Sequence, residues 1–411
     1  MQYILQEVDS PKLEQEFLDV VKLIYRDYPN YVRPFDSSIK QIFDPKKNKL
    51  FSDGEAIRWV VKESNSCRVV GRIAAFYNRE QASLEEQPTG GCGFFEAIDN
   101  KEVAFLLFDA AREWLKSKGM EAMDGPINFG ARDAFWGLLV ENFDSQPLFE
   151  NPYNPPYYKA LFEEYGFMNY FNQHSYVKKI EVGALSEAVY ERVKRLRENP
   201  SFRFEHAKRN NLDKLIEDFR VVYNKAWSGF SGVKEMTREE ALSMMNMLKP
   251  IFDERLLYFA YYDNEPVGFF IMIPDLNRII GDFDGKLGFW QMIKLWWRLK
   301  VRRKVDRVFG LIFGVTPEFQ GKGVESGMIY AFEEQVKGLS YKSLELAWIG
   351  DFNPVMMRMV ESFVCASKFK MHTTYRYLFD REKEFKRCPS LRRKRKPMPQ
   401  QESSEAENKE N

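Results

Sequence analysis

The sequence predicts a mixed α/β protein made of two related halves. A hairpin of apolar strands at residues 57–61 and 69–77 is repeated by strands at residues 256–262 and 267–273. Farther along, each half has an apolar helix, a short loop and an aromatic-rich strand. The separation along the chain between the two hairpins is almost the same as the separation between the two helix–loop–strand segments. We therefore expect two copies of one unit, each a twisted mixed sheet flanked by helices.

The elements of the first half follow from local patterns. Apolar residues recur every three or four positions over residues 13–28, which predicts a helix that ends before Pro29 and Asn30. A polar turn separates the two strands of the first hairpin. Residues 157–167 predict a second apolar helix, and residues 174–180 predict the strand that follows it.

The same patterns divide the chain into four segments. Residues 1–182 form an N-terminal domain, and residues 183–201 form a polar linker helix that ends at the turn of Asn199 and Pro200. Residues 202–381 form the C-terminal domain. Residues 382–411 have many charged and few apolar side chains, so they cannot bury enough surface to fold. They predict a disordered charged tail.

Composition is that of a soluble globular protein and excludes several function classes. The chain has 411 residues, 44% of them hydrophobic, and 61 basic against 60 acidic residues, a net charge of +1. This balance gives the body of the protein no general attraction to nucleic acid. The four cysteines are widely separated and lack metal-ligand spacing, so we expect neither disulfides nor a metal site. Because no secretion signal or membrane-spanning run is recognisable, we expect a cytoplasmic location.

One motif in the second half is a candidate ligand-binding loop. An apolar strand runs from Val308 to Val315, and after Pro317 a glycine loop, residues 320–324 (QGKGV), opens a helix. Glycine lets backbone N–H groups come close to a ligand, and the first turn of a helix has unpaired donors with partial positive charge. The loop therefore suits a phosphate or pyrophosphate, although it follows neither the GxGxxG nor the Walker A pattern.

This loop lies between a strand and a helix, followed by a strand at residues 343–350 and a second helix opened by Asn353. That order resembles the GNAT superfamily of acetyl-CoA-dependent N-acyltransferases over residues 202–379. In the family the loop binds the pyrophosphate of coenzyme A, the preceding strand runs beside the pantetheine arm, and the asparagine lies near the thiol. The resemblance implies that acyl-CoA is bound by Phe313, Gly314, Val315, Gln320, Gly321, Lys322, Gly323, Val324, Ser326 and Asn353.

The second half departs from the family pattern at two positions. The last glycine or alanine of the family loop is Glu325 here, a carboxylate that would repel a pyrophosphate if it faced the ligand. The tyrosine that many family members use as general acid is replaced by Val360. Glu345 is a candidate base, and the alternative is an outward-facing strand carboxylate.

The first half has no corresponding glycine loop. Its strand passes into a helix through an acidic cap at residues 99–102, so we do not expect it to bind coenzyme A in the same way. Residues 35–379 together are similar to a tandem GNAT-like family of bacterial proteins. This wider resemblance implies that the first half is a degenerate copy that shapes the substrate cleft, with Trp227 in a substrate-side segment. The alternative is that its aromatic residues only form the core between domains.

An insertion at residues 285–304 predicts a basic amphipathic helix with Phe289, Ile293, Trp296 and Trp297 toward one side. Such a helix lies on an anionic membrane surface, folds over a cleft as a lid, or packs its tryptophans into the domain interface. The basic cluster at residues 391–396 of the tail is typical of a solvated charge run.

The predicted reaction is transfer of an acetyl or related acyl group from acetyl-CoA, or another acyl-CoA, to the amine of a small molecule or peptide, without a metal. Two alternatives remain open from the residues. One is a tRNA-dependent aminoacyl-transferase, which the basic insertion and tail would serve. The other is a non-catalytic, CoA-binding scaffold protein, for which Glu325 and Val360 are the reasons.

Overall fold

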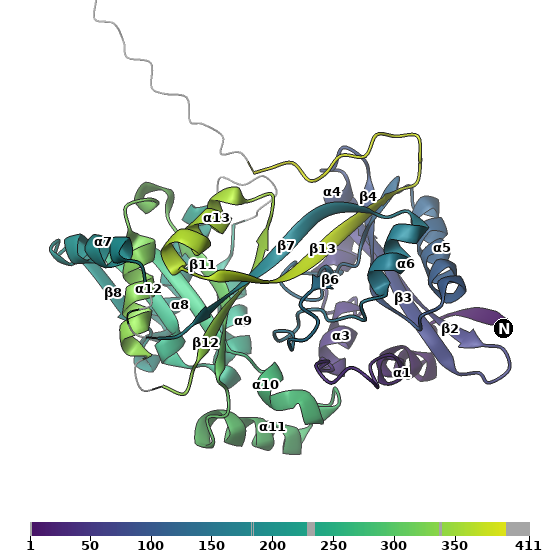
Figure 1. Ribbon diagram of the computed structural model, residues 1–411, viewed down its shortest axis with the longest axis horizontal. Helices are drawn as coiled ribbons and strands as arrows, with labels where there is room; N and C mark the ends of the chain where they lie inside the picture. The colour runs from purple at the N-terminus through teal and green to yellow at the C-terminus, as the bar shows by residue number, and fades with distance from the viewer. Residues whose placement is uncertain (1, 182, 184, 228–234, 337–338, 392–411) are drawn as a thin grey trace, which may run out of the picture.

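The computed structural model describes residues 2–181, 183, 185–227, 235–336 and 339–391. In this part of the chain two lobes lie side by side along the long axis, and long strands join them across the middle (Figure 1). Residues 392–411 of the predicted tail lie outside the described residues. None of the helices in the described ranges combines the length and the apolar character that a membrane span requires.

A single mixed sheet of thirteen strands runs through both lobes and confirms the predicted mixed α/β class. Its order is β1-β2-β3-β4-β5-β13-β7-β12-β11-β10-β9-β8, and β6 pairs with β13 beside this path. The strands are β1 (Tyr3–Glu7), β2 (Gly54–Glu63), β3 (Val69–Asn78), β4 (Thr89–Ala97), β5 (Ala122–Gly125), β6 (Leu138–Glu141), β7 (Met168–Lys179), β8 (Phe202–His206), β9 (Leu257–Tyr262), β10 (Glu265–Pro274), β11 (Arg307–Val315), β12 (Ser343–Gly350) and β13 (Ser367–Leu378).

The two predicted hairpins are confirmed and occupy equivalent places in the halves. β2 and β3 pair antiparallel, with Gly71 beside Val61, and β9 and β10 do the same, with Gly268 beside Ala260. Each hairpin is followed by a strand, β4 or β11, which pairs antiparallel with the hairpin and parallel with the next strand, β5 or β12. The repeated pairing pattern supports the interpretation of the chain as two copies of one unit.

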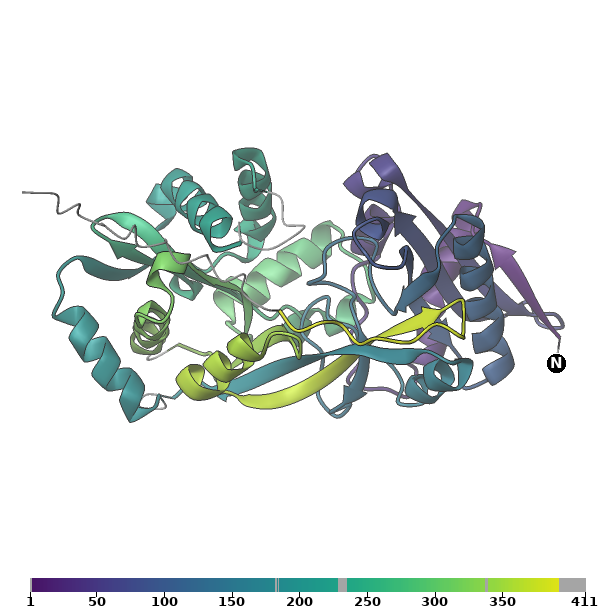
Figure 2. The same ribbon diagram turned by 90° about the horizontal axis from the view of Figure 1, so that it is seen from above.

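The two halves exchange their last strands. β7 ends the first half but pairs with β12 of the second, where Val177 lies beside Glu345. β13 ends the second half but pairs with β5 of the first, where Tyr375 lies beside Gly125. The exchanged strands also pair with each other and cross the middle of the molecule (Figures 1 and 2). Each half therefore completes its sheet with a strand of the other, which the local sequence pattern does not predict.

Helices cover the sheet in both lobes (Figure 1). The helix expected over residues 13–28 is two helices with Val20 between them, and Val20 keeps helical dihedral angles, so the interruption is local. The helices are α1 (Pro11–Asp19), α2 (Val21–Ile24), α3 (Asp36–Ile42), α4 (Arg79–Ala82), α5 (Lys101–Ser117), α6 (Tyr158–Tyr165), α7 (Glu187–Arg197), α8 (Leu212–Trp227), α9 (Arg238–Leu248), α10 (Asn277–Ile280), α11 (Phe289–Trp296), α12 (Val324–Gln335) and α13 (Pro354–Met359).

Helix α5 shows how sequence pattern becomes packing in the first half. The Asn100 side chain accepts a hydrogen bond from the N–H of Val103 and so caps the helix. The apolar face buries Leu107 and Phe108 completely against the first-half core. That core also contains Tyr375 of β13, so the exchanged strand is part of its packing. The second half has its own core around β9, β10 and α12.

Candidate active site

A cleft opens where the parallel strands β11 and β12 separate. The two strands pair only from Arg307 beside Ser343 to Gly310 beside Leu346. At the next residue, Leu311, a bulge interrupts the pairing of β11 with β10 on the other side. Beyond this point the backbone groups of β11 that face β12 no longer pair with that strand. They form a strand edge inside the molecule that is available to a ligand.

The cleft holds a cavity of about 280 Å³ with mostly apolar walls. Residues 311–313 of β11 and residues 346–350 of β12 form two sides of it. The helical side is lined by Ile329 of α12 and by Met356, Met359, Val360 and Val364, which are in or just after α13. Three residues that the sequence assigned to the site, Trp227, Phe313 and Asn353, line the same cavity.

The predicted phosphate loop follows directly from the end of β11. Gly321 and Gly323 have φ angles of 76° and 93°, the left-handed region that glycine adopts without strain, and Gly323 is the N-cap of α12. The Gln320 side chain donates Nε2–H to the carbonyl of Val315 at 2.8 Å, so it fixes the loop to the strand. Lys322 is exposed, and its ammonium stands 5.0 Å from the centre of the Phe319 ring.

The Glu325 side chain turns back onto this loop. Its Oε1 accepts a hydrogen bond from the backbone N–H of Gly321 at 3.4 Å. The sequence predicts a conflict between this carboxylate and a pyrophosphate. In the structure the carboxylate instead accepts a hydrogen bond from the Gly321 N–H, a donor that a phosphate oxygen would otherwise use.

The remaining loop residues point inward. A Cβ at Gly323 would come within 2.6 Å of Cδ of Arg192 in α7, so the linker helix packs directly against the loop. Val324 and Ser326 are buried, and Ser326 Oγ has no hydrogen-bond partner among the described residues. Their side chains are turned away from solvent, so any contact of these two residues with a ligand at the loop surface would come from their backbone.

Glu345 has a different setting from either sequence interpretation. It is buried, with 1% of its surface exposed, on a strand that is paired on both sides, with β11 and with the exchanged strand β7. Its carboxylate accepts hydrogen bonds from Lys370 Nζ at 3.0 Å, Arg307 Nη1 at 3.1 Å and Ser175 Oγ at 2.9 Å. Arg307 in turn pairs with buried Asp275 at 2.6 Å. The outward-facing interpretation is wrong, because the carboxylate is buried and is paired with two cations.

Asn353 and Val360 belong to the helix that closes the cavity. Asn353 Oδ1 accepts a hydrogen bond from the N–H of Met356 at 3.2 Å, so this side chain caps α13. Val360 begins the wider turn at residues 360–364 and is 2% exposed. An apolar side chain thus stands on the cavity wall where the family resemblance implies a phenol.

Comparison with solved structures gives this architecture a counterpart. The tandem GNAT protein from the clavulanic acid biosynthesis pathway aligns over 92% of this chain and 99% of that protein, with a TM-score of 0.52 and 11% identity. The chain described here has the tandem GNAT fold. No family model matches the sequence.

Two curated proteins are similar over most of their length. The chain is 28% identical over 384 residues to the bacterial ceramide synthase of Caulobacter vibrioides, which covers 90% of this chain and 95% of that protein. It is 27% identical over 370 residues to protein YghO of Escherichia coli, which covers 87% of this chain and 91% of that protein.

The first GNAT-like half contains the equivalent cleft between β4 and β5. These strands pair only from Thr89 beside Ala122 to Gly91 beside Asp124, and the pairing of β4 with β3 is then shifted by a bulge at residues 94–95. Phe94 has a φ angle of 51°. The two halves of the tandem GNAT fold therefore share both the separating parallel strands and the bulge next to them.

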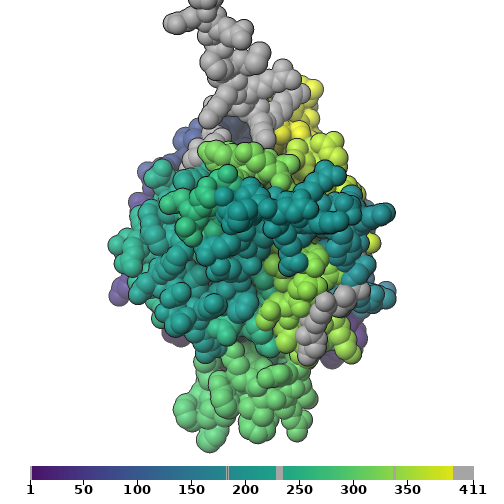
Figure 3. Space-filling model, turned by 90° about the vertical axis from the view of Figure 1, so that its left-hand side faces the viewer, coloured from purple at the N-terminus to yellow at the C-terminus, as the bar shows by residue number. Residues whose placement is uncertain are grey.

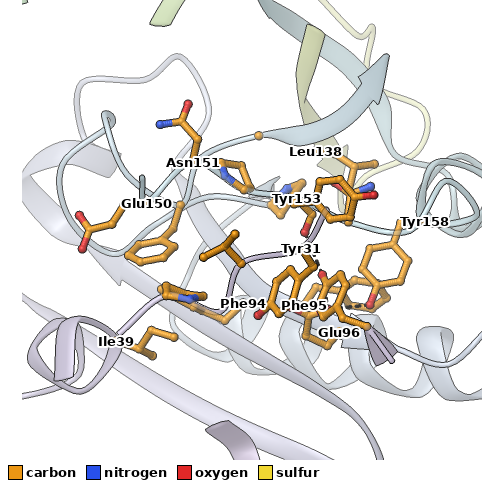
Figure 4. Close-up of a pocket in the computed structure, with 18 of the residues that line it drawn as sticks. Tyr31, Ile39, Phe94, Phe95, Glu96, Leu138, Glu150, Asn151, Tyr153 and Tyr158 are labelled. Carbon is orange, nitrogen blue, oxygen red and sulfur yellow. Dashed lines mark hydrogen bonds between the residues drawn. The ribbon is translucent and has the colours of Figure 1, made fainter. Parts of the chain in front are cut away.

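Polar groups of the chain itself fill this first cleft. The carboxylate of Glu96, at the end of β4, accepts hydrogen bonds from the hydroxyls of Tyr25 and Tyr158, each at 2.8 Å. Burial raises the pKa of Glu96, and Arg72 opposes that shift. Figure 4 shows Glu96 beside Tyr158 at one end of the pocket and Glu150 at the other. The two equivalent clefts thus differ in size and in lining, because the first keeps a cavity of about 90 Å³ beside Glu96 and the second an apolar cavity of about 280 Å³.

Glu150 lines the first cleft, and the loop that carries Asp133 reaches the wall of the second. The backbone carbonyl of Arg132 accepts a hydrogen bond from Trp348 Nε1, on the wall of the second cleft, at 2.7 Å. The N–H of Phe135, in the same loop, donates to the backbone carbonyl of Glu150 at 2.9 Å and so brings the Asp133 loop beside Glu150. Burial raises the pKa of Glu150, and the charge of Asp133 adds to that shift. The charge of Asp133 also acts on Tyr223, whose pKa is raised mainly by burial.

Tyr223 packs beside the second cleft. Its ring stacks on Trp227 with centroids 4.9 Å apart, and Trp227 lines the cavity between β11 and β12. Asp133 and Glu150 are candidate residues that the sequence did not identify. Neither belongs to a motif, and only the tertiary fold brings their irregular loops beside the C-terminal half.

Proposed function

We propose that the protein is an acyl-CoA-dependent N-acyltransferase whose donor site is the cleft between β11 and β12. The observation that carries the proposal is the apolar cavity between these strands, with the glycine loop at the end of β11. Backbone donors of residues 320–324 and the N-terminal end of α12 suit the pyrophosphate. The free edge of β11 beyond Gly310 suits the amides of the pantetheine arm.

The cavity favours a fatty acyl chain over an acetyl group. Apolar side chains from α12 and α13 extend the space beyond the strand edge. Met356 and Met359 are flexible side chains that adapt to a chain of variable length. One relative is named a ceramide synthase, and this name implies acyl transfer by that relative. A ceramide is the amide of a fatty acid and a long-chain amino alcohol, so we propose a long-chain amino alcohol as the acceptor class.

The acceptor amine reaches the thioester from the side of Asp133 and Glu150 in this proposal. An alkylamine is protonated at neutral pH, so two nearby carboxylates both attract it and accept its proton. Glu150 suits the second role because burial raises its pKa above that of an exposed carboxyl. The amine nitrogen then bonds to the acyl carbon, the carbon–sulfur bond breaks, and the second proton lost by the nitrogen goes to the departing sulfur, which leaves as the free thiol. Backbone N–H groups at the bulge near Leu311 stabilise the developing oxyanion.

The structural role of Glu345 follows from its partners. Its carboxylate neutralises Lys370 of the exchanged strand β13 and Arg307 of β11. Truncating one member of such a group leaves an uncompensated buried charge. In this proposal Glu345 therefore holds the strands in place, and proton transfer falls to Glu150.

A transfer assay tests the proposal. Purified protein is incubated with palmitoyl-CoA and sphinganine, free thiol is measured as it is released, and the amide is identified by mass spectrometry. We expect one amide for each thiol. Asp133→Asn and Glu150→Gln should each lower the rate by about tenfold to a thousandfold, whereas Asp144→Asn, in an exposed part of the same long connection, should not change it. Binding of palmitoyl-CoA without product over a panel of long-chain amines would support the non-catalytic alternative and contradict the proposal.

A further inference from the structure

Helix α11 and the turn after it, at residues 297–301, carry an exposed apolar face. Phe289 and Trp290 are 73% and 75% exposed, and Trp296 and Trp297 are 56% and 49% exposed. Ile293 and Val301 extend this face along the same side at helical spacing. The tryptophans therefore do not pack into the domain interface, which was one of the sequence interpretations. We call these six residues the aromatic face.

The opposite side of α11 holds the segment onto the body of the protein. Leu295 is buried and Leu299 packs beside it, in a cluster that includes Phe283 and Val305. Before the helix, the N–H of Asp36 in the first half donates to the carbonyl of Gly285 at 2.9 Å. The segment around α11 projects from the molecule as a separate lobe, green in the space-filling view (Figure 3). The aromatic face is thus carried on a fixed support and turned away from the core.

The charge of this lobe is complementary to an anionic surface. Residues 285–304 contain seven lysines and arginines and no acidic residue. Lys294 and Arg298 pair with Asp282 at 2.5 and 2.6 Å, which fixes the helix. Directly after the aromatic face, Arg302, Arg303 and Lys304 are exposed.

A polar cavity of about 240 Å³ next to the lobe extends the positive charge. Its walls carry four cationic side chains, from Lys300 and Arg303 of the lobe and from Arg209 and Arg255 of the body. The two acidic residues on its walls are already engaged. Asp253 pairs with Arg255 at 2.7 Å, and Glu254 accepts the N–H of Arg209 at 3.2 Å. Cations are therefore in excess beside the aromatic face.

We infer that the lobe at residues 285–304 docks the protein on an anionic phospholipid bilayer. Tryptophan and phenylalanine partition into the boundary between head groups and acyl chains, and basic side chains bind the phosphates of the same leaflet. Protein interfaces are also rich in aromatic residues and arginine, so the choice of a bilayer rests on the charge of the lobe, which has seven basic residues and no acidic one. The inference is independent of the proposed reaction, because it rests on residues outside the donor cleft.

Vesicle flotation with the full-length protein tests the inference. Vesicles of phosphatidylglycerol are compared with vesicles of phosphatidylcholine at low and high salt. We expect the protein to float with phosphatidylglycerol and to be released by salt. A variant with Trp290→Ser and Trp297→Ser should bind at least about tenfold more weakly. Its matched control carries Leu84→Ser and Met247→Ser, two other exposed apolar positions (69% and 71%), and should bind like the wild type.

A charge variant separates the electrostatic contribution of the basic side chains from the apolar contribution of the aromatic face. Arg302→Gln, Arg303→Gln and Lys304→Gln together should reduce binding to phosphatidylglycerol by roughly fivefold for each charge removed and flatten its salt dependence. Circular dichroism verifies the fold of every variant. The inference is overturned if the wild-type protein does not float, or if the tryptophan variant floats as well as the control. It is also overturned if the tryptophan variant changes only the oligomeric state measured by analytical ultracentrifugation, which would make a second copy the occupant of the aromatic face.

Discussion

The Glu325 carboxylate accepts a hydrogen bond from the backbone N–H of Gly321 at 3.4 Å. The bond is long for an N–H donor, so a stronger acceptor displaces it at little cost. It nevertheless places negative charge in the loop that we propose to bind pyrophosphate. We therefore expect Glu325 to weaken donor binding without closing the site.

Replacing Glu325 with alanine should strengthen binding of acyl-CoA. The substitution frees the Gly321 N–H and removes a like charge, and we expect the dissociation constant to fall by about fivefold at low salt. Calorimetric titration with decanoyl-CoA measures the effect. Glu318→Ala, an exposed carboxylate in the turn at residues 317–319 just before the loop, is the matched control and should change the affinity less. An unchanged affinity in Glu325→Ala would show that pyrophosphate does not approach this loop.

Filling the cavity at Val360 should change the preference for acyl chain length. Val360 is buried on the cavity wall, so a Val360→Phe side chain takes space that we assign to the acyl chain. We expect kcat/KM for palmitoyl-CoA to fall by about tenfold and that for butyryl-CoA to change by less than about twofold. Val355→Phe, at a position 61% exposed on the same helix, serves as control. Equal losses for both donors would place the chain elsewhere.

The pH dependence of transfer should report Glu150. Burial and the neighbouring Asp133 raise the pKa of Glu150 above 4.5, so the group loses its base function at a pH where an exposed carboxylate is still ionised. We expect kcat/KM to rise with pH through this raised pKa. In Glu150→Gln the acidic limb due to this group should disappear, and the remaining rate should be lower at all pH values. Retention of the same limb in the variant would exclude Glu150 as the base.

Stability at acid pH should depend on His372, which is fully buried and donates Nε2–H to the carbonyl of Pro152. Desolvation lowers the pKa of His372 from 6.5 to about 4. Between these values the unfolded chain binds a proton that the folded chain does not, so stability is lost as the pH falls. The loss from this group is about 3 kcal/mol over that window.

Urea unfolding at several pH values measures this contribution. His372→Gln keeps a donor for Pro152 but cannot gain the charge, so its free energy of unfolding should fall less steeply between pH 6.5 and 4. The difference between the two slopes isolates this group from the carboxylates that titrate in the same range. Identical slopes in the two proteins would mean that His372 titrates normally in the folded state.

Local pattern in the sequence was sufficient for the repeated halves and for the glycine loop. The hairpin strands are short apolar runs separated by polar turns, and the loop at residues 320–324 needs glycine for its positive φ angles. The strand exchange leaves no such signal, because β7 and β13 look the same whichever half they complete. The burial of Glu345 depends on that exchange. The contacts of the loop at residues 132–135 with Trp348 and Glu150 also depend on segments far apart in the chain, so the sequence did not predict them.

The claim that the glycine loop receives the pyrophosphate of acyl-CoA is tested most directly by calorimetric titration of decanoyl-CoA into two glycine variants. Gly321 and Gly119 both have positive φ angles, 76° and 82°, and an added Cβ meets no atom within 4 Å at either. Gly321→Trp and Gly119→Trp therefore carry similar backbone strain in open space, one at the loop and one at the far end of α5. We predict saturable, one-to-one binding by the wild type and Gly119→Trp and no binding by Gly321→Trp. Equal binding by both variants would contradict the account.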